Sequence, residues 1–409
     1  MKITKVEVFR LPTANSKQNS PIGCRIHTDV GICGDGEAGM AYGVGGSGAF
    51  GMVCDLAELI IGMDPLRTEF IWETMYKRTF WGQNGGPVVF SGIAAIDVAL
   101  WDIKGKYFNV PVYKLLGGKT NPKLRAYASQ LQFGWSDLIQ KDNKGEALGL
   151  LFDPKDYYEV TKNALRDGYD AIKVDPVFAP TDPDTPLEKI WGSQGTQIRG
   201  CYRQHDLQRS VERIAACREA GGPDMDIIVE IHSLLDANTA AELGKALEPL
   251  HIMYFEEPTS PENPSNFRHI KQKCDLPLAT GERSYTRWGF RQFFEDRTLS
   301  VIQPDLCNTG GITETKKICD MAQVYDMGVQ IHVCGGPIAT AAALQVEAAI
   351  PNFTIHEEHN ANLKNIFIQA GKYYYKPENG YYTVPDLPGI GQEMTDEFLA
   401  TCRKVVIGG

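Results

Sequence analysis

The sequence predicts an α/β protein: a TIM-type (β/α)8 barrel joined to a smaller α+β domain. From about residue 125 onward, short β-rich runs alternate with helical patterns. Strands that alternate with helices pair in parallel through right-handed crossovers. Eight such units between residues 125 and 370 match the usual barrel size of about 250 residues, and the 409-residue chain leaves room for a second domain.

The first 124 residues are predicted to form most of the smaller domain. Residues 2–10 alternate apolar and polar side chains, as a strand does, and residues 31–51 are rich in glycine, which is typical of loops and turns. Residues 90–107 place Ile93, Ile96, Leu100 and Ile103 at helical spacing. Residues 371–409 are predicted to return from the barrel to this first domain.

Eight barrel strands are predicted between residues 125 and 370, and two of the connections that follow them are long. The two connections span residues 133–158 and 176–207, and both are expected on the C-terminal rim, where barrel enzymes build their active sites. The predicted strands are Leu124–Ala128, Ala171–Val174, Ile227–Ile231, Met253–Glu256, Leu278–Gly281, Val301–Gln303, Val329–Ile331 and Phe353–Ile355.

Charge and composition exclude several classes of partner. The chain carries 51 acidic and 41 basic residues, a net charge of −10, which argues against a surface for nucleic acid or anionic membranes. We find no apolar run of about 18 residues and no signal-peptide pattern, so we expect neither a membrane span nor export. The ten cysteines are scattered without a C-x-x-C pair, which favours reduced thiols in a cytoplasmic protein.

Three carboxylates stand at the ends of consecutive predicted strands. Glu230, Glu256 and Glu282 end strands three, four and five and lie 26 residues apart in each step. One βα unit per step would bring them to the same height at the barrel mouth. Three such charges repel one another unless a cation lies between them, and an all-oxygen set favours Mg²⁺ over zinc. We therefore expect one Mg²⁺ per active site.

The next strand ends carry candidates for acid–base chemistry. Asp305 ends strand six and His332 ends strand seven, one unit later. A neighbouring carboxylate orients an imidazole and raises its basicity, which suits a general base. His232 lies two residues after Glu230, on the same face of the strand, and is either a metal ligand or, more economically, the general acid opposite His332.

Three further polar residues reach the same rim with more open roles. Glu357, after strand eight, is either a site residue or a surface acid. Lys173 and Asp175 share a face of strand two. Either Lys173 stabilises an enolate or a substrate carboxylate, or the two residues form an ion pair that closes the strand end.

These motifs resemble the enolase superfamily and, within it, the mandelate racemase subgroup. The run Ser91–Lys106 (SGIAAIDVALWDIKGK), the segment Gly310–Glu314 (GGITE) and the strand-seven segment through Pro337–Ala339 are similar to that family. The resemblance implies an α+β capping domain over a barrel. It also implies Mg²⁺ on the three glutamates, a base dyad of His332 and Asp305, and a contact of Glu357 with the substrate carboxylate as it becomes an enediolate.

The histidine two residues past the first metal ligand is similar to sugar-acid dehydratases such as galactonate and mannonate dehydratases. Two departures from the family pattern stand out. Glu230 occupies a position where many members have Asp, and strand two carries Lys173-Val-Asp175 rather than a paired Lys-x-Lys. The missing second lysine argues against two-base racemisation through that strand, although Lys173 opposite His332 leaves a route to it.

The sequence thus predicts an Mg²⁺-dependent dehydratase that converts an acid sugar into a 2-keto-3-deoxy acid. Alternatives are an epimerase or cycloisomerase on a similar acid sugar, or a catalytically degenerate sugar-acid-binding regulatory protein. The expected partner is a small-molecule acid sugar, and the resemblance implies a homo-oligomer. Candidates for substrate binding outside the core set are Asp175, Tyr202, Arg199 and Asn84.

Overall fold

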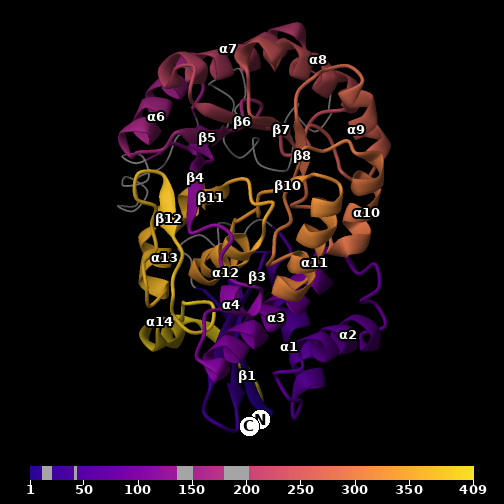
Figure 1. Ribbon diagram of the computed structural model, residues 1–409, viewed down its shortest axis with the longest axis vertical. Helices are drawn as coiled ribbons and strands as arrows, with labels where there is room; N and C mark the ends of the chain where they lie inside the picture. The colour runs from indigo at the N-terminus through magenta and orange to yellow at the C-terminus, as the bar shows by residue number, and fades with distance from the viewer. Residues whose placement is uncertain (12–20, 41–43, 136–150, 179–201) are drawn as a thin grey trace.

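The chain forms a barrel and a smaller α+β domain packed against one of its ends (Figure 1). The structure, a computed structural model, describes residues 1–11, 21–40, 44–135, 151–178 and 202–409. The barrel fills the upper part of the view in Figure 1, and the indigo N-terminal segment lies below it with both chain ends.

The smaller domain is an antiparallel sheet covered by helices. The sheet order is β13-β1-β2-β3, so the last strand of the chain pairs with the first. The strands are β1 (Ile3–Arg10), β2 (Ile22–Thr28), β3 (Cys33–Ala38) and β13 (Arg403–Gly408). The helices are α1 (Gly46–Ile60), α2 (Thr68–Arg78), α3 (Gly86–Phe108) and the single turn α4 (Val112–Leu115).

The expectation of loop structure across residues 31–51 is wrong for much of that stretch, which contains β3 and the start of α1. Two of its glycines, Gly34 and Gly36, serve close packing rather than turns. A Cβ atom on Gly36 would lie 1.8 Å from the carbonyl oxygen of Ala95, and one on Gly34 would lie 2.2 Å from that of Ala99. Strand β3 therefore lies directly on helix α3, which a side chain would prevent.

Helix α3 is the central helix of this domain and extends the predicted span slightly at both ends. By length and composition it could cross a membrane, but 78% of its most apolar window is buried inside the protein. A core helix gives the same pattern, because a helix that is apolar on all sides is buried either in protein or in lipid.

Among the described residues, eight parallel strands form the barrel, with helices outside them. The strands are β4 (Lys123–Ser129), β5 (Ala171–Val174), β6 (Asp226–Glu230), β7 (Tyr254–Glu256), β8 (Leu278–Thr280), β9 (Val301–Ile302), β10 (Gly328–Val329) and β11 (His356–His359). The helices are α6 (Pro154–Arg166), α7 (Gln204–Gly221), α8 (Ala237–Leu247), α9 (Pro264–Lys271), α10 (Thr286–Asp296), α11 (Gly311–Val324) and α12 (Pro337–Ala349).

Two of the sequence predictions need correction here. The eighth strand is His356–His359 rather than residues 353–355, and Phe353 makes only a single parallel bridge to Val329. The apolar run was misleading, because this strand buries charged side chains that find partners, such as His356 on Glu347. The long connection after the first strand also ends earlier than residue 158, since α6 begins at Pro154.

The segment after the barrel returns along its side to the smaller domain. It contains α13 (Asn365–Ala370), β12 (Tyr381–Thr383), which pairs antiparallel with β4, and α14 (Asp396–Thr401) before β13. Arg25 of β2 fastens this segment: its guanidinium bonds both oxygens of Asp35, at 2.7 and 2.8 Å, and the carbonyl of Met394 at 2.6 Å.

The Arg25→Ala variant is expected to lower the free energy of unfolding by about 3 kcal/mol, because the buried Asp35 loses its cation. Urea unfolding followed by circular dichroism measures this. The exposed pair of Arg291 and Glu295 gives the control, and Arg291→Ala should cost less than about 1 kcal/mol. Equal effects of the two variants would contradict the role given to Arg25.

Candidate active site

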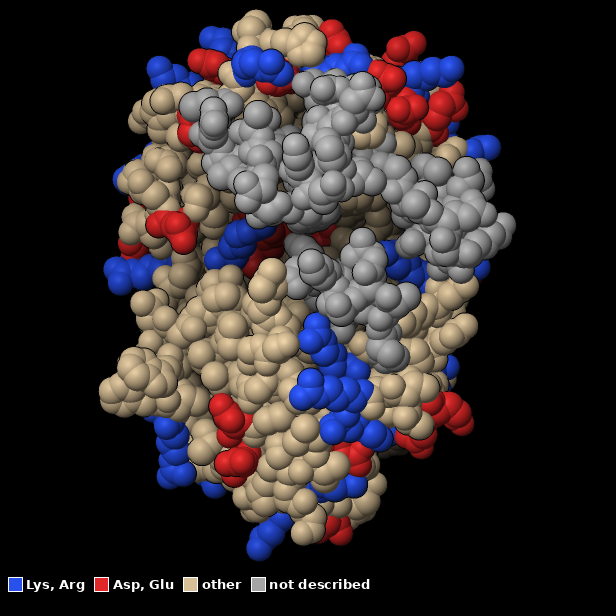
Figure 2. All heavy atoms as spheres, turned by 180° about the vertical axis from the view of Figure 1, so that it is seen from behind, with Lys and Arg blue, Asp and Glu red and all other residues tan. Residues whose placement is uncertain are grey.

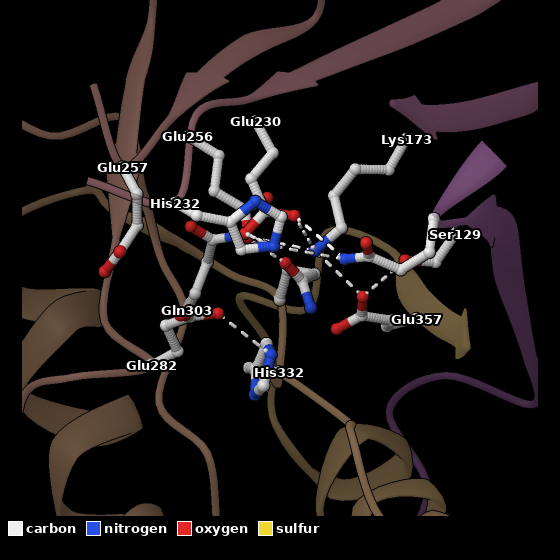
Figure 3. A network of polar contacts seen from close by, with 12 residues as sticks. Ser129, Lys173, Glu230, His232, Glu256, Glu257, Glu282, Gln303, His332 and Glu357 are labelled. Carbon is white, nitrogen blue, oxygen red and sulfur yellow. Dashed lines mark hydrogen bonds and ion pairs between the residues drawn. The ribbon is translucent and has the colours of Figure 1, made fainter. Parts of the chain in front are cut away.

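Three carboxylates converge where neighbouring barrel strands end. Glu230 and Glu256 are register partners at the ends of β6 and β7, and Glu282 follows β8 by two residues. All three are buried, and they offer oxygen atoms that all lie within 4.8 Å of one another. Figure 3 shows Glu230 and Glu256 pointing the same way from adjacent strands. Of the predicted metal ligands, the structure brings all three together.

Lys173 of β5 lies beside this triad and is fully buried. Its Nζ is 3.1 Å from Glu230, 3.0 Å from Glu256 and 2.8 Å from Glu357 (Figure 3). Burial lowers the pKa of this ammonium, but the three carboxylates outweigh burial and hold the pKa well above its usual value. Lys173 therefore stays charged, and all three of its donor positions face acceptors.

The triad still carries excess negative charge. Burial, together with the neighbouring Glu230, raises the pKa of Glu256 to about 8, and burial also raises the pKa of Glu230. Oε2 of Glu256 is buried and has no hydrogen-bond donor among the described residues. An unsatisfied carboxylate oxygen among three acids fits a divalent cation held by Glu230, Glu256 and Glu282.

His332 and Asp305 form a buried dyad on one side of the triad. Nδ1 of His332 lies 2.9 Å from Oδ2 of Asp305, and Nε2 lies 3.0 Å from Oε2 of Glu282. Asp305 is itself held by the backbone N–H of Cys307, which donates to its other oxygen at 2.8 Å. The imidazole is thus fixed with Nε2 directed toward the triad.

A second dyad faces it from the other side. Nδ1 of His232 lies 2.6 Å from Oδ2 of Asp175, and its Nε2 lies 3.2 Å from Oε1 of Glu230. The other oxygen of Asp175 accepts the N–H groups of Val177 and Phe178 at 2.7 and 2.8 Å. Asp175 therefore binds His232 through one oxygen while its own turn fixes the other, and its role in substrate binding stays a prediction.

Glu357 lies at the base of the site, on β11. Its Oε1 accepts hydrogen bonds from Ser129, at 2.6 Å, and from Lys173, and its Oε2 accepts the backbone N–H of Val333 at 2.9 Å. Burial would raise the pKa of this carboxyl, but Lys173 and His332 outweigh burial and hold it below its usual value. Glu357 is ionised and surrounded by donors, so it is not a surface acid.

Sequence reasoning missed two glutamines at the end of β4. The Gln130 amide donates to Oε2 of Glu230 at 3.1 Å, and Gln132 donates to Gln130 while accepting the N–H of Asp175 at 3.2 Å. The two side chains link Glu230 to the dyad of His232 and Asp175. The signal was available, because both follow a barrel strand, but a glutamine neither titrates nor ranks as a usual metal ligand.

Two of the remaining predicted site residues, Tyr202 and Asn84, lie apart from this cluster. The hydroxyl of Tyr202 donates to the carbonyl of Val177 at 3.1 Å, which supports the turn that carries Asp175. Asn84 is exposed in the loop before α3. Arg199 lies outside the described residues. Figure 2 shows acidic and basic atoms together at the bottom of a hollow between the barrel and the smaller domain.

Comparison with known families accounts for both domains. Residues 4–117 match the N-terminal domain model of the mandelate racemase / muconate lactonizing enzyme family, and residues 156–398 match the model described as enolase C-terminal domain-like. The chain belongs to this family. The predicted family and the predicted capped barrel are thereby confirmed.

Relatives of known sequence and structure agree. The chain is 32% identical to a D-galactonate dehydratase of Cronobacter sakazakii over 97% of this chain and 93% of the relative, and 33% identical to one of Ralstonia pickettii over 99% and 94%. A solved member of the enolase superfamily from Salmonella Typhimurium superimposes with a TM-score of 0.92 at 49% identity, covering 99% of both chains. The 3,6-anhydro-D-galactonate cycloisomerase of Zobellia galactanivorans gives 0.80 at 28% identity, covering 98% of this chain and 99% of that one.

Divalent metal binding should depend on the triad. Glu256→Gln is expected to weaken binding of Mn²⁺ or Mg²⁺ by more than about 100-fold, since losing even an outer partner of a ligand costs about 10- to 100-fold. Isothermal titration calorimetry measures this without substrate. Glu358→Gln is the control, because Glu358 is a buried acid of β11 that bonds Tyr382 instead of the triad. Tight binding by the Glu256 variant would exclude the triad as the metal site.

Proposed function

We propose that this protein is an Mg²⁺-dependent dehydratase of an acid sugar, an aldonate or aldarate, and that its product is a 2-keto-3-deoxy acid. The observation that carries the proposal is the pair of carboxylate–histidine dyads on opposite sides of a carboxylate triad. One dyad can take a proton while the other gives one, which is what elimination of water from a hydroxy acid requires.

His332 acts as the base. Its Nδ1 is bound to Asp305, so Nε2 is the nitrogen that faces the triad, 3.0 Å from Oε2 of Glu282, and it removes the proton from the carbon next to the substrate carboxylate. His232, held by Asp175 in the same manner, gives its Nε2 proton to the departing β-hydroxyl. The C–H and C–O bonds break, water leaves, and the resulting enol becomes the 2-keto-3-deoxy acid.

Lys173 and Glu357 stabilise charge at the base of the site. Glu357 already accepts three hydrogen bonds and the ammonium of Lys173 is engaged by three carboxylates, so Lys173 stabilises a substrate carboxylate, as it becomes an enediolate, through its fixed positive charge rather than through a hydrogen bond of its own. Glu357 holds Lys173 in place, and Ser129 in turn holds Glu357. Since its ammonium is engaged by three carboxylates, Lys173 is a poor base, and this disfavours racemisation through strand β5.

Glu230, Glu256 and Glu282 would hold Mg²⁺, a cation that prefers oxygen ligands. When bound, it supplies Lewis-acid stabilisation of the substrate carboxylate and makes the neighbouring proton more acidic. Two side chains hold members of the triad in place. Gln130 donates to Glu230, and Arg283 donates to both Glu282 and its neighbour Glu257.

The relatives support elimination over its alternatives. Curated relatives that share about a third of their residues with this chain are D-galactonate dehydratases. The cycloisomerase of Zobellia galactanivorans is more distant, but its fold is the same, so ring opening or closure of an anhydro acid sugar is the second candidate function. An intact triad with two complete dyads favours an enzyme over a binding protein with a regulatory role.

We propose a cytoplasmic homo-oligomer that takes a small acid sugar as its substrate and binds neither nucleic acid nor membrane. The nine cysteines that lie in the described part of the chain are all free, which suits a reducing compartment. The excess of acidic residues disfavours a nucleic-acid surface.

The base assignment is tested with His332→Asn. Exchange of the α-proton with deuterated solvent and formation of 2-keto product should both fall by about 10²- to 10⁴-fold, the usual contribution of a general base. His356→Asn is the matched control, because His356 is also buried and bonded to a carboxylate, Glu347 at 2.6 Å, but on the outer face of β11. Undiminished exchange in the His332 variant would exclude it as the base.

The reaction type is tested by mass spectrometry on a stereochemically complete panel of acid sugars in the presence of Mg²⁺. A dehydratase gives a product lighter than its substrate by one water, with a 2-keto group, and loses activity on chelation of the metal. A product of unchanged mass would instead establish an epimerase or cycloisomerase. Metal binding without turnover on any member of the panel would favour the regulatory alternative.

A further inference from the structure

The smaller domain supplies a buried carboxylate to the barrel loop that carries His332. Glu37 belongs to β3, is 3% exposed, and lies against the start of helix α12. One of its oxygens accepts the N–H of Gly336, and the other accepts the N–H of Ala339 at 3.2 Å. The cap of α12 thus comes from a residue about 300 positions away, in another domain.

A carboxylate at this place does what a side chain of the helix itself usually does. The first N–H groups of a helix lack partners within the helix, and negative charge is favourable there. The residue that precedes α12 is Gly336, which has no side chain to offer. Glu37 therefore fixes where α12 begins, and this point, Pro337, lies five residues after His332.

The glycines of this loop leave room for Glu37. A Cβ atom on Gly336 would lie 3.0 and 3.2 Å from the two oxygens of Glu37, and these are its nearest contacts. One on Gly335 would lie 2.7 Å from Oε1 of Glu37. The loop between His332 and α12 follows the surface of this carboxylate.

The same edge of the smaller domain also contacts the loop that carries Asp305, the partner of His332 in the dyad. The N–H of Gly39, two residues after Glu37, donates to the carbonyl of Cys307 at 2.7 Å. The N–H of Cys307 in turn holds Asp305. The end of β3 therefore contacts both loops that carry the dyad.

We infer that Glu37 is a positioning residue for the base, which it holds in line with the triad by anchoring the loop from His332 to α12. This inference rests on the proposed role of His332. It gives the smaller domain a part in the chemical step in addition to covering the site.

The test compares Glu37→Ala and Glu37→Gln with the Asp97→Asn variant. Asp97 of α3 is the matched control, since its two oxygens bond the N–H and hydroxyl of Thr313 at 2.9 and 2.6 Å and so fasten the smaller domain to the start of α11. We expect Glu37→Ala to lower kcat by about 10- to 100-fold, the cost of a displacement of roughly 1 Å at a catalytic group. KM should change less than about threefold.

Glu37→Gln, which keeps an oxygen of the same reach, should recover part of the lost kcat. Asp97→Asn should lower the unfolding temperature without the fall in kcat. Equal loss of kcat in the Asp97 and Glu37 variants would mean general loosening between the domains and would overturn the inference.

A double-mutant cycle gives a second, independent readout. Gly336→Ala should lower kcat in the otherwise unchanged protein, because its Cβ presses on Glu37, but should have little further effect in the Glu37→Ala background. Additive losses would overturn the inference. If His332→Asn keeps its α-proton exchange, the proposed function fails. If that variant loses exchange while Glu37→Ala keeps full kcat, only the role of Glu37 fails.

Discussion

The repulsion among buried carboxylates at the barrel mouth is the constraint on which the rest of the site depends. Glu230, Glu256 and Glu357 are buried around one ammonium, that of Lys173, and Glu282 is buried beside Glu230 and Glu256. Such an arrangement is costly without further positive charge. These acids need positive charge or hydrogen-bond donors beside them. The two histidines, Arg283 and the proposed divalent cation each supply one or the other.

The structure separates the chemistry into two halves that share a common form. In each half an aspartate binds Nδ1 of a histidine and directs Nε2 toward the triad, and in each the aspartate is fixed by backbone N–H groups of its own turn. In the proposed reaction, this common form lets one dyad remove a proton while the other delivers one.

The sequence was most informative where one residue type and one spacing coincided. Strand ends one βα unit apart placed Glu230, Glu256 and Glu282 together, because parallel strands in a barrel end at one height. The sequence was least informative where a contact joins distant segments. The bond from Glu37 to Gly336 crosses between domains, Asp175 turns toward His232 through a local turn, and Gln130 has no charge to attract notice. The eighth strand was predicted a few residues too early, at 353–355, because the charged residues of the true strand, His356–His359, do not follow an apolar pattern and are buried in pairs.

The pairing of β13 with β1 joins residues 403–408 to residues 5–10. During synthesis, the first strand therefore pairs early with β2 but waits for almost the whole chain before its second neighbour exists. The barrel between them can begin to form while the sheet below it still has an open edge, an exposed strand of the kind that invites pairing with other chains. The contact from Glu37 to the loop of His332 needs the domain that this sheet belongs to. The anchoring of the proposed base by Glu37 thus depends on a sheet that is complete only once residues 403–408 have been made.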